Sequence, residues 1–488
     1  MTAVTEFETL LIGGKMTRPA SDARIEVVSP HTEEVIGRVP SAAPADIDAA
    51  VAAARAAFDS GPWPRMALKE RLEILARLSE LLKPRAEDIG RLISRQNGSP
   101  YSWSVLAQAY APIMVLDYYL EMATQFPFER SQPGMLGPVL VRGEPAGVAA
   151  AIVPWNVPLF TTMSKFAPAM VAGCTMVLKP SPQTPLDAYL LAELAAEAGL
   201  PEGVLSVVPA EADASEHLVA HPGVDLVAFT GSLPAGRRIM AACAENLTRV
   251  SLELGGKSAA ILLPDADLEA AVPGVLPNAY MNNGEACVAL TRVLAPRETY
   301  AEVVDRMAAA VGALRVGDPL DAETEVGPLV SAQHRERVEG YVKDGVAAGA
   351  RLVAGGRRPA GEPTGWYLEP TLLADVDNGM RVAREEIFGP VVCVIPYDGD
   401  AAEAVRIAND SEYGLSGCVW TADVERGIDV ARQVRTGNFA VNGFGLEFSA
   451  PFGGFKHSGI GREFGPEGLA AYLEYKTVHL PAGYQPAG

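Results

Sequence analysis

The chain has 488 residues, which is too many for a single hydrophobic core, so we expect two large domains and a small third element. Hydrophobic residues make up 49% and charged residues 20% of the sequence, as in an ordinary soluble globular protein. The formal net charge of −20 repels polyanions, so nucleic acid and anionic membrane are not expected partners.

The beginning of the chain and its cysteines indicate a cytoplasmic protein. Residues 1–10 lack the basic segment and the apolar run of a signal peptide. The apolar stretches 147–153 and 167–178 are too short to span a bilayer. Five scattered cysteines without a Cys-x-x-C pair, and without metal-ligand spacing to the six histidines, are typical of a reduced protein and predict no metal site.

The first half of the chain predicts helices, followed by alternating strands and helices. Apolar residues at helical spacing predict amphipathic helices over 45–59 and 64–97. From residue 146 we expect strands over 147–153, 175–179, 204–208, 224–229 and 250–254, and helices over 161–172, 185–198 and 235–246. Strands that alternate with helices of about 10–15 residues indicate βαβ units around a parallel sheet.

A second series of the same kind follows from 258 to 450. It predicts strands over 293–295, 352–354, 391–396, 417–420 and 438–441, and helices near 299–314, 333–349, 401–409 and 423–434. Segment 126–145 is punctuated by Pro and Gly, and 475–480 has the pattern of an exposed edge strand. Because an isolated strand needs a partner, we expect these two segments to form an oligomerisation arm.

Two segments indicate covalent chemistry. Cys287 follows the loop-like Asn283-Gly284-Glu285, and Glu253 lies 34 residues earlier between leucines and before two glycines. A thiolate attacks electrophilic carbon, and a carboxylate in apolar surroundings has a raised pKa and takes a proton from water. Most free cysteines are simply small buried residues, an interpretation that suits Cys174, Cys243, Cys393 and Cys418. Likewise, an arbitrary glutamate is more often a surface residue.

Four further motifs lie where loops are expected. Pro154-Trp155-Asn156 follows a strand at its carboxyl end, where open α/β sheets bind ligands, and the Asn156 amide can donate to an oxyanion. Phe229-Thr230-Gly231-Ser232 joins a strand to a helix, whose N-terminal amides favour phosphate. Without a function, Asn156 would be an ordinary turn asparagine, and 229–232 would be an ordinary strand-to-helix turn. The loops 385–390 and 451–456 carry exposed acids and aromatic residues.

In this order, the motifs resemble those of the NAD(P)-dependent aldehyde dehydrogenase superfamily. The resemblance covers nearly the whole chain, from Leu11 to Glu463, and the set is much more specific than any one motif. Its motifs are Pro-Trp-Asn at 154–156, Leu-Lys-Pro at 178–180, Phe-Thr-Gly-Ser at 229–232, Glu-Leu-Gly-Gly-Lys at 253–257, Gly-x-x-Cys at 284–287, Glu-Glu-Ile-Phe-Gly-Pro at 385–390 and Pro-Phe-Gly-Gly at 451–454.

The resemblance implies catalytic roles. Cys287 matches the nucleophile, Glu253 the general base, and Asn156 with the Cys287 amide the oxyanion hole. Lys165 and Glu463 match a pair that relays protons away from the base.

The resemblance also implies a coenzyme site for NAD. Lys179 matches a contact to the adenosine ribose and Ser232 a contact to the pyrophosphate, while Glu386 and Phe388 match the clamp on the nicotinamide ribose and ring. The other matching positions are Ile152, Val153, Pro154, Trp155, Ser181, Pro182, Phe229, Gly231, Ala235, Leu254 and Gly255.

Three positions depart from the family pattern. Pro182 stands where an acid usually binds both adenosine-ribose hydroxyls, and 210–214 replaces glycines near the adenine. These changes leave the choice between NAD and NADP open, although we favour NAD, because no arginine stands beside Lys179, and expect NADP to be tolerated. Glu285 replaces a common glutamine and changes the acidity of Cys287 if its side chain points inward.

We therefore expect an α/β protein with a Rossmann-like coenzyme domain over 1–125 and 146–255. An α/β catalytic domain over 256–455 and a small β arm over 126–145 and 473–488, which makes a homodimer or homotetramer, complete the expected fold. The expected reaction oxidises an aldehyde to a carboxylic acid through a cysteine thioester that Glu253-activated water hydrolyses. The alternatives are a CoA-acylating semialdehyde dehydrogenase, against which Glu253 argues, and a catalytically silent protein on the same scaffold.

The expected substrate is a medium-to-large hydrophobic aldehyde. Val157, Thr161 and Ser164 fall on one helix face at positions that match the family's substrate tunnel, and all three are small and uncharged. Phe444, Leu446 and Phe448 match the loop at the tunnel mouth. The alternative is that these side chains face the core and that other residues narrow the tunnel.

Overall fold

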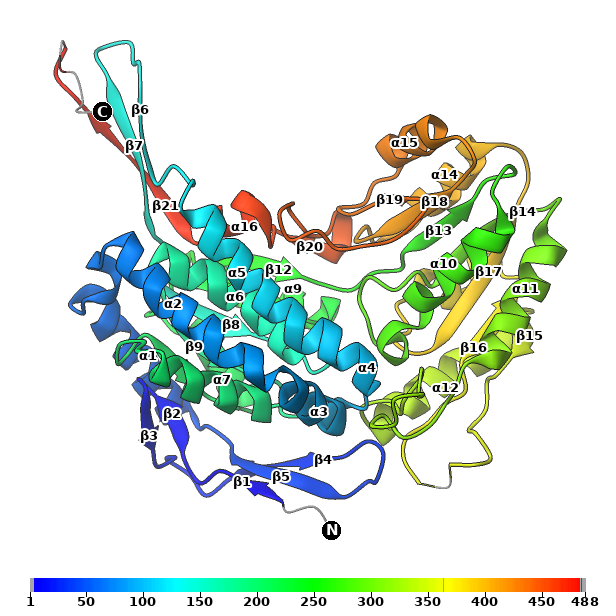
Figure 1. The fold of residues 1–488 in the computed structure, drawn as a ribbon, viewed down its shortest axis with the longest axis horizontal. Helices are drawn as coiled ribbons and strands as arrows, with labels where there is room; N and C mark the ends of the chain where they lie inside the picture. Colours follow the sequence, from blue (N-terminus) through cyan, green and yellow to red (C-terminus); the bar gives the residue numbers. More distant parts are fainter. Residues whose placement is uncertain (1–3, 363, 483, 485–488) are drawn as a thin grey trace.

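Two large sheets, each covered by helices on both faces, make up most of the molecule (Figure 1). The computed structural model describes residues 4–362, 364–482 and 484. Within these residues, the first sheet has eight strands. From one edge to the other they are β20 (Gly459–Ile460), β12 (Arg249–Glu253), β11 (Leu226–Thr230), β8 (Val148–Ile152), β9 (Thr175–Lys179), β10 (Leu205–Val207), β2 (Leu10–Ile12) and β3 (Lys15–Thr17).

The five central strands of this sheet are parallel. In chain order they are arranged 3-2-1-4-5, which is the order of a Rossmann-type sheet and confirms the predicted fold class. The winding reverses between β8 and β11, and a crevice for ligands forms outside such a switch point. The edge strand β20 is antiparallel to its neighbour, and so is β2, which lies between β10 and the other edge strand, β3.

Successive side chains along each strand pack on opposite faces of the first sheet. Ala149 and Leu178 contact one helical layer, whereas Val148 and Val177 contact the other. The first layer contains α2 (Leu68–Leu82), α3 (Ala86–Asn97), α5 (Ala111–Ala123), α6 (Pro158–Ala172) and α7 (Leu186–Glu197). The second contains α1 (Pro44–Asp59), α8 (Ala212–Ala220) and α9 (Leu233–Asn246).

The second sheet is built in the same way. From one edge to the other its strands are β15 (Arg351–Ala354), β16 (Thr371–Ala374), β17 (Val391–Tyr397), β14 (Arg292–Pro296), β13 (Ala259–Leu262), β18 (Gly417–Trp420) and β19 (Ala440–Val441). One face packs against α10 (Leu268–Tyr280) and α11 (Tyr300–Ala313), and the other against α12 (Ala332–Ala347), α14 (Ala401–Asn409) and α15 (Val424–Gln433).

Two small sheets flank these layers. One contains β1 (Thr5–Glu6), β5 (Val35–Pro40) and β4 (Arg24–Val28). In the other, β7 (Val139–Pro145) lies between β6 (Glu129–Gln132) and β21 (Leu473–His479), and this sheet projects away from the body (Figure 1). The segments predicted to form an arm thus pair with each other, although 483 and 485–488 of the predicted arm lie outside the described residues.

The remaining helical segments are short. They are α4 (Tyr101–Ser104), the π-helix Val105–Tyr110, α13 (Arg381–Arg384), α16 (Gly465–Ala470) and the 3₁₀ turns Trp63–Arg65, Lys83–Arg85, Met281–Gly284 and Lys456–Ser458.

Two helix predictions need correction, and proline explains both. The predicted helix 64–97 is two helices, because Pro84 lies in the 3₁₀ turn Lys83–Arg85 and has no N–H for an α-helical hydrogen bond. The helix predicted from Thr161 begins at Pro158, since proline is favoured in the first helical turn.

Two predictions from the sequence concern membrane-spanning segments and the state of the cysteines, and the structure bears on both. Within the described residues, no helix is both long and apolar enough to cross a membrane. All five cysteines carry free thiols.

Candidate active site

The carboxyl ends of four parallel strands lie side by side in the first sheet. Ile152 of β8 pairs in register with Lys179 of β9 and with Phe229 of β11, and Thr230 of β11 pairs with Glu253 of β12. Two cavities, of about 670 and 490 Å³, are lined by the residues at these ends and by the loops that follow them. They therefore lie at the switch point of the sheet.

The larger cavity brings together residues that are far apart in the sequence. Asn156, Glu253, Cys287, Glu386 and Glu463 all line it. So do the other predicted residues Pro154, Trp155, Gly231, Ser232, Leu254, Gly255 and Phe388.

Cys287 follows a tight turn that other parts of the chain hold in place. Asn282, Asn283 and Gly284 have φ values of 49°, 61° and 72°, a left-handed conformation that asparagine and glycine tolerate best. The Asn283 side chain donates to the carbonyls of Gly98 and Pro328, at 3.0 Å each. The turn is thereby fixed, and Cys287 is left partly exposed in the cavity wall.

The environment of Cys287 favours the protonated thiol. Burial, followed by the negative charges of Glu386 and Glu253, raises its pKa to about 12. A thiolate at neutral pH therefore requires that a base take the proton or that a positive charge lie nearby.

Glu253 is a buried carboxylate without hydrogen-bond partners. Its side chain is 3% exposed, and neither carboxylate oxygen has a partner among the described residues. Burial and the charge of Glu463 raise its pKa well above the ordinary value, while Lys165 and Arg462 oppose the shift. An unpaired carboxylate with a raised pKa at a cavity wall is suited to general-base chemistry.

Lys165 and Glu463 form a buried ion pair behind Glu253. Lys165 Nζ lies 2.6 Å from Glu463 Oε1 and 2.5 Å from Thr230 Oγ1. The two residues are 298 positions apart in the chain. The pair adjoins the cavity, because Glu463 is one of its lining residues.

Asn156 reaches from the β8 side toward the Cys287 loop. Its Nδ2 donates to the backbone carbonyl of Glu285 at 2.8 Å. The backbone carbonyl of Asn156 accepts from the side chains of Asn97 and Asn282. An amide nitrogen has two hydrogens, so the second remains available to a ligand. The residue is 5% exposed and is therefore well fixed for such a role.

Glu386 fits closely against the glycines after Glu253. Its Oε1 accepts from Gly256 N at 3.0 Å, and a Cβ on Gly255 would lie 2.1 Å from its Oε2. Only glycine permits this approach at position 255. Burial raises the pKa of Glu386 to about 7.

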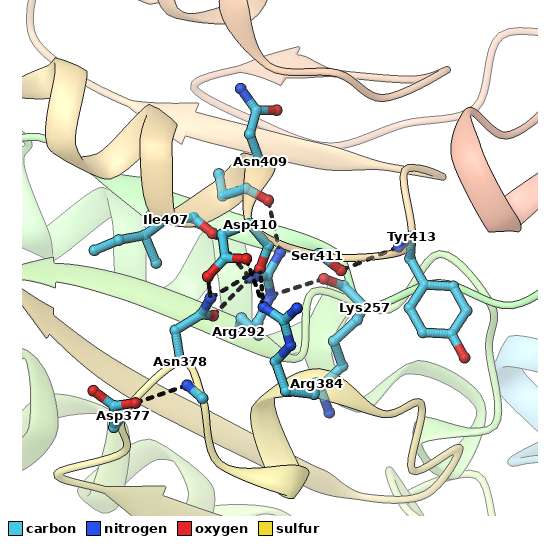
Figure 2. A network of polar contacts seen from close by, with 12 residues as sticks. Lys257, Arg292, Asp377, Asn378, Arg384, Ile407, Asn409, Asp410, Ser411 and Tyr413 are labelled. Atoms are coloured by element: carbon cyan, nitrogen blue, oxygen red, sulfur yellow. Dashed lines mark hydrogen bonds and ion pairs between the residues drawn. The ribbon is translucent and has the colours of Figure 1, made fainter.

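A buried polar network anchors the loop between β12 and β13 to the second sheet. Arg292 of β14 donates to the carbonyls of Lys257, Ile407 and Ala408 and to Asn378 Oδ1, at 2.9 to 3.2 Å (Figure 2). The guanidinium thereby satisfies buried carbonyls and fixes the chain just beyond Gly256.

The smaller cavity contains other predicted coenzyme residues. Ile152, Lys179, Pro182, Phe229 and Ala235 line it.

Two predicted contacts lie outside both cavity linings. Val153 packs into the core, and its N–H donates to the Lys179 carbonyl at 3.2 Å. Ser181 Oγ donates to Gln183 Oε1 at 2.5 Å, so its hydroxyl is turned to its own loop.

The predicted substrate face needs correction at two positions. Val157, Thr161, Leu446 and Phe448 line the larger cavity, but Ser164 is buried and donates to the Thr161 carbonyl. Phe444 packs instead against the core of the second sheet.

Sequence reasoning missed several wall residues. Trp103, Ala107, Ala111, Phe160 and Phe452 add apolar surface, so the wall is more aromatic than the three small residues suggested. The helix that carries Trp103 had no recognised motif, and only the fold places it here.

The side chain of Glu285 points inward. It is 1% exposed, and its Oε1 accepts from Val330 N at 3.0 Å and lies 3.7 Å from His334 Nε2. Its backbone carbonyl accepts from Asn156 Nδ2 at 2.8 Å, so Glu285 helps to fix the geometry of the loop before Cys287.

A Rossmann-type sheet with a cysteine and a buried carboxylate at its switch point is the arrangement of a coenzyme-dependent α/β enzyme. The chain belongs to the aldehyde dehydrogenase family, whose model matches residues 17–478. It is therefore an oxidoreductase that acts on aldehydes.

Similar proteins match over nearly the whole chain. A geranial dehydrogenase of Castellaniella defragrans is 48% identical over 476 residues, which cover 97% of this chain and 99% of that protein. An aldehyde dehydrogenase of Mycobacterium tuberculosis, solved with NAD+, is 48% identical, with a TM-score of 0.98 over 99% of this chain and 100% of that one. A mutant aldehyde dehydrogenase of Pseudomonas syringae, solved with NAD+ and octanal, is 40% identical, with a TM-score of 0.94 over 99% and 98%.

Proposed function

We propose that this protein oxidises a hydrophobic aldehyde to its carboxylic acid with NAD as the acceptor. The observation that carries the proposal is the shared cavity of Cys287, Asn156 and Glu253, whose carboxylate has no hydrogen-bond partner among the residues that the structure describes. Cys287 adds to the aldehyde carbon, and the Asn156 amide with the Cys287 N–H stabilises the oxyanion. Loss of a hydride from the thiohemiacetal, for which bound NAD would be the acceptor, would give a thioester, and water activated by Glu253 would then release the acid and restore the thiol.

Lys165 and Glu463 would carry the proton that Glu253 takes from water. Their ion pair adjoins Glu253, and the charge of Glu463 already contributes to its raised pKa. A proton accepted by Glu253 therefore has a buried acceptor beside it.

The two cavities fit NAD. Lys179 and Pro182 would face the adenosine ribose. Ser232 and the helix that follows it would face the pyrophosphate, and Glu386 and Phe388 would face the nicotinamide riboside. When bound, the nicotinamide supplies the acceptor for hydride. The NAD+ complexes of the two related structures support this choice, and NADP should be tolerated.

On this proposal, residues 1–125 and 146–255 form the coenzyme domain and 256–455 the catalytic domain. Segments 126–145 and 473–488 would join subunits into a dimer or tetramer, in keeping with the projection of the exposed sheet of β6, β7 and β21 from the body. The free thiols are consistent with a cytoplasmic location.

Spectrophotometry of NADH with hexanal tests the reaction class. We expect NADH to form without CoA, because Glu253 supplies a base for hydrolysis. Strict dependence on CoA would contradict the proposal and favour the acylating alternative. Absence of NADH with every aldehyde, in the presence and absence of CoA, would favour the catalytically silent alternative.

The apolar wall leads us to expect a preference for longer aldehydes. Trp103, Phe160, Leu446, Phe448 and Phe452 offer apolar contact to the substrate. Each buried methylene contributes about 0.8 kcal/mol, so kcat/KM should rise roughly fourfold per carbon until the cavity is full. The names of the related geranial dehydrogenase and of the octanal complex support this expectation.

A four-aldehyde panel measures this preference. We expect kcat/KM for hexanal and for a bulky aromatic aldehyde to exceed that for acetaldehyde and for succinate semialdehyde. A higher value for either of the last two would show that the apolar wall does not select the substrate.

A further inference from the structure

Four charged residues line the smaller cavity, and they are not equivalent. Arg238 pairs with Glu216 at 3.4 Å. Lys179 is largely buried, and its ammonium group makes no hydrogen bond or ion pair within the described part of the chain. Burial lowers the pKa of Lys179 to about 8, and the charge of Glu211 opposes this shift. Glu211 is thus the carboxylate that faces the buried lysine.

The Glu211 carboxylate also makes no hydrogen bond or ion pair with any residue that the structure describes. The residue is exposed and precedes α8 as its N-cap, yet its carboxylate makes no capping hydrogen bond. Its backbone carbonyl, not its side chain, accepts from Ser215 Oγ at 2.7 Å. Its carboxylate is available to a ligand in the cavity.

We propose that Glu211 binds the ribose hydroxyls of the adenosine half of NAD and thereby makes the enzyme prefer NAD over NADP. Pro182 lines the same cavity, but its side chain has no hydrogen-bond acceptor. A carboxylate accepts hydrogen bonds from two vicinal hydroxyls, whereas the doubly charged 2′-phosphate of NADP is repelled by it. Lys179 offsets part of that repulsion, so NADP still binds. This inference rests on the proposed function.

Equilibrium binding of NAD+ and NADP+ tests the role of Glu211 without turnover. We expect Glu211→Gln to raise the Kd for NAD+ about tenfold and to lower the Kd for NADP+, measured by calorimetry. Glu245→Gln is the matched control, because it removes the same charge from an exposed residue of α9 that does not line the cavity. It should change the Kd for NAD+ by less than about twofold.

The outcomes separate this inference from the proposed function. A wild-type protein that binds neither dinucleotide would overturn both. Binding of NAD+ by wild type, with a Kd ratio of NADP+ to NAD+ that stays within about twofold in Glu211→Gln, would overturn the role of Glu211 alone. Equal effects of Glu211→Gln and Glu245→Gln would also overturn it, since a general loss of charge would explain them. Adding Pro182→Glu to Glu211→Gln should return the ratio toward wild type.

Discussion

Replacing Cys287 with alanine is expected to abolish aldehyde oxidation while NAD+ still binds. Without the thiol, no covalent adduct forms, and the oxyanion donors have no tetrahedral intermediate to stabilise. The side chain is small and partly exposed, so its loss should leave the fold intact. NADH formation measures turnover, and calorimetry measures binding. Residual activity above about 1% of wild type would contradict the role of Cys287.

Cys243→Ala is the matched control. Cys243 is also a free thiol, but it is buried in helix α9, and burial raises its pKa to about 11. Because Cys243 lines neither cavity, its replacement should leave turnover near wild type. A large loss in Cys243→Ala would mean that general destabilisation, not chemistry, explains the effect at Cys287.

Replacing Glu253 with glutamine is expected to leave a first-turnover burst of NADH and to slow the steady state strongly. The variant keeps the size of the side chain but removes the base, so the thioester forms and is not hydrolysed. Removal of one base typically costs about 10² to 10⁴ in rate. Stopped-flow absorbance separates the two phases. If the burst also disappears, Glu253 acts earlier, through activation of Cys287.

The raised pKa of Glu253 adds a pH signature to this result. The carboxylate is the active form, so wild-type deacylation should fall as pH decreases through the raised pKa. The Glu253→Gln variant has no group to protonate there, and its slow steady state should lose this acidic limb. A limb of unchanged shape in the variant would assign the titration to a residue other than Glu253.

The sequence predicted the sheets better than the cavity. Strands such as Gly417–Trp420 are short apolar runs between turns, so their bounds follow from local pattern. The ion pair of Lys165 and Glu463 joins residues 298 positions apart, and no local signal indicates it. Its prediction came from a family resemblance and not from the residues themselves.

The cavity wall shows the same limit. Helical spacing put Ser164 on the face of Thr161, but its hydroxyl turns to the helix backbone and its side chain is buried. Trp103 enters the wall because a π-helix and α5 follow it and pack against α6. Glu211 lies in a segment whose sequence only signalled a departure from glycines, and the fold brings it to the cavity of Lys179.

The central claim is that an acyl group is carried on Cys287 and released by Glu253. Mass spectrometry of Glu253→Gln, quenched in acid after mixing with NAD+ and hexanal, tests it most directly. The expected result is one hexanoyl group per chain, on the peptide that contains Cys287, in an amount that matches the NADH burst. A burst of NADH with no acyl group on that peptide would contradict covalent catalysis by Cys287.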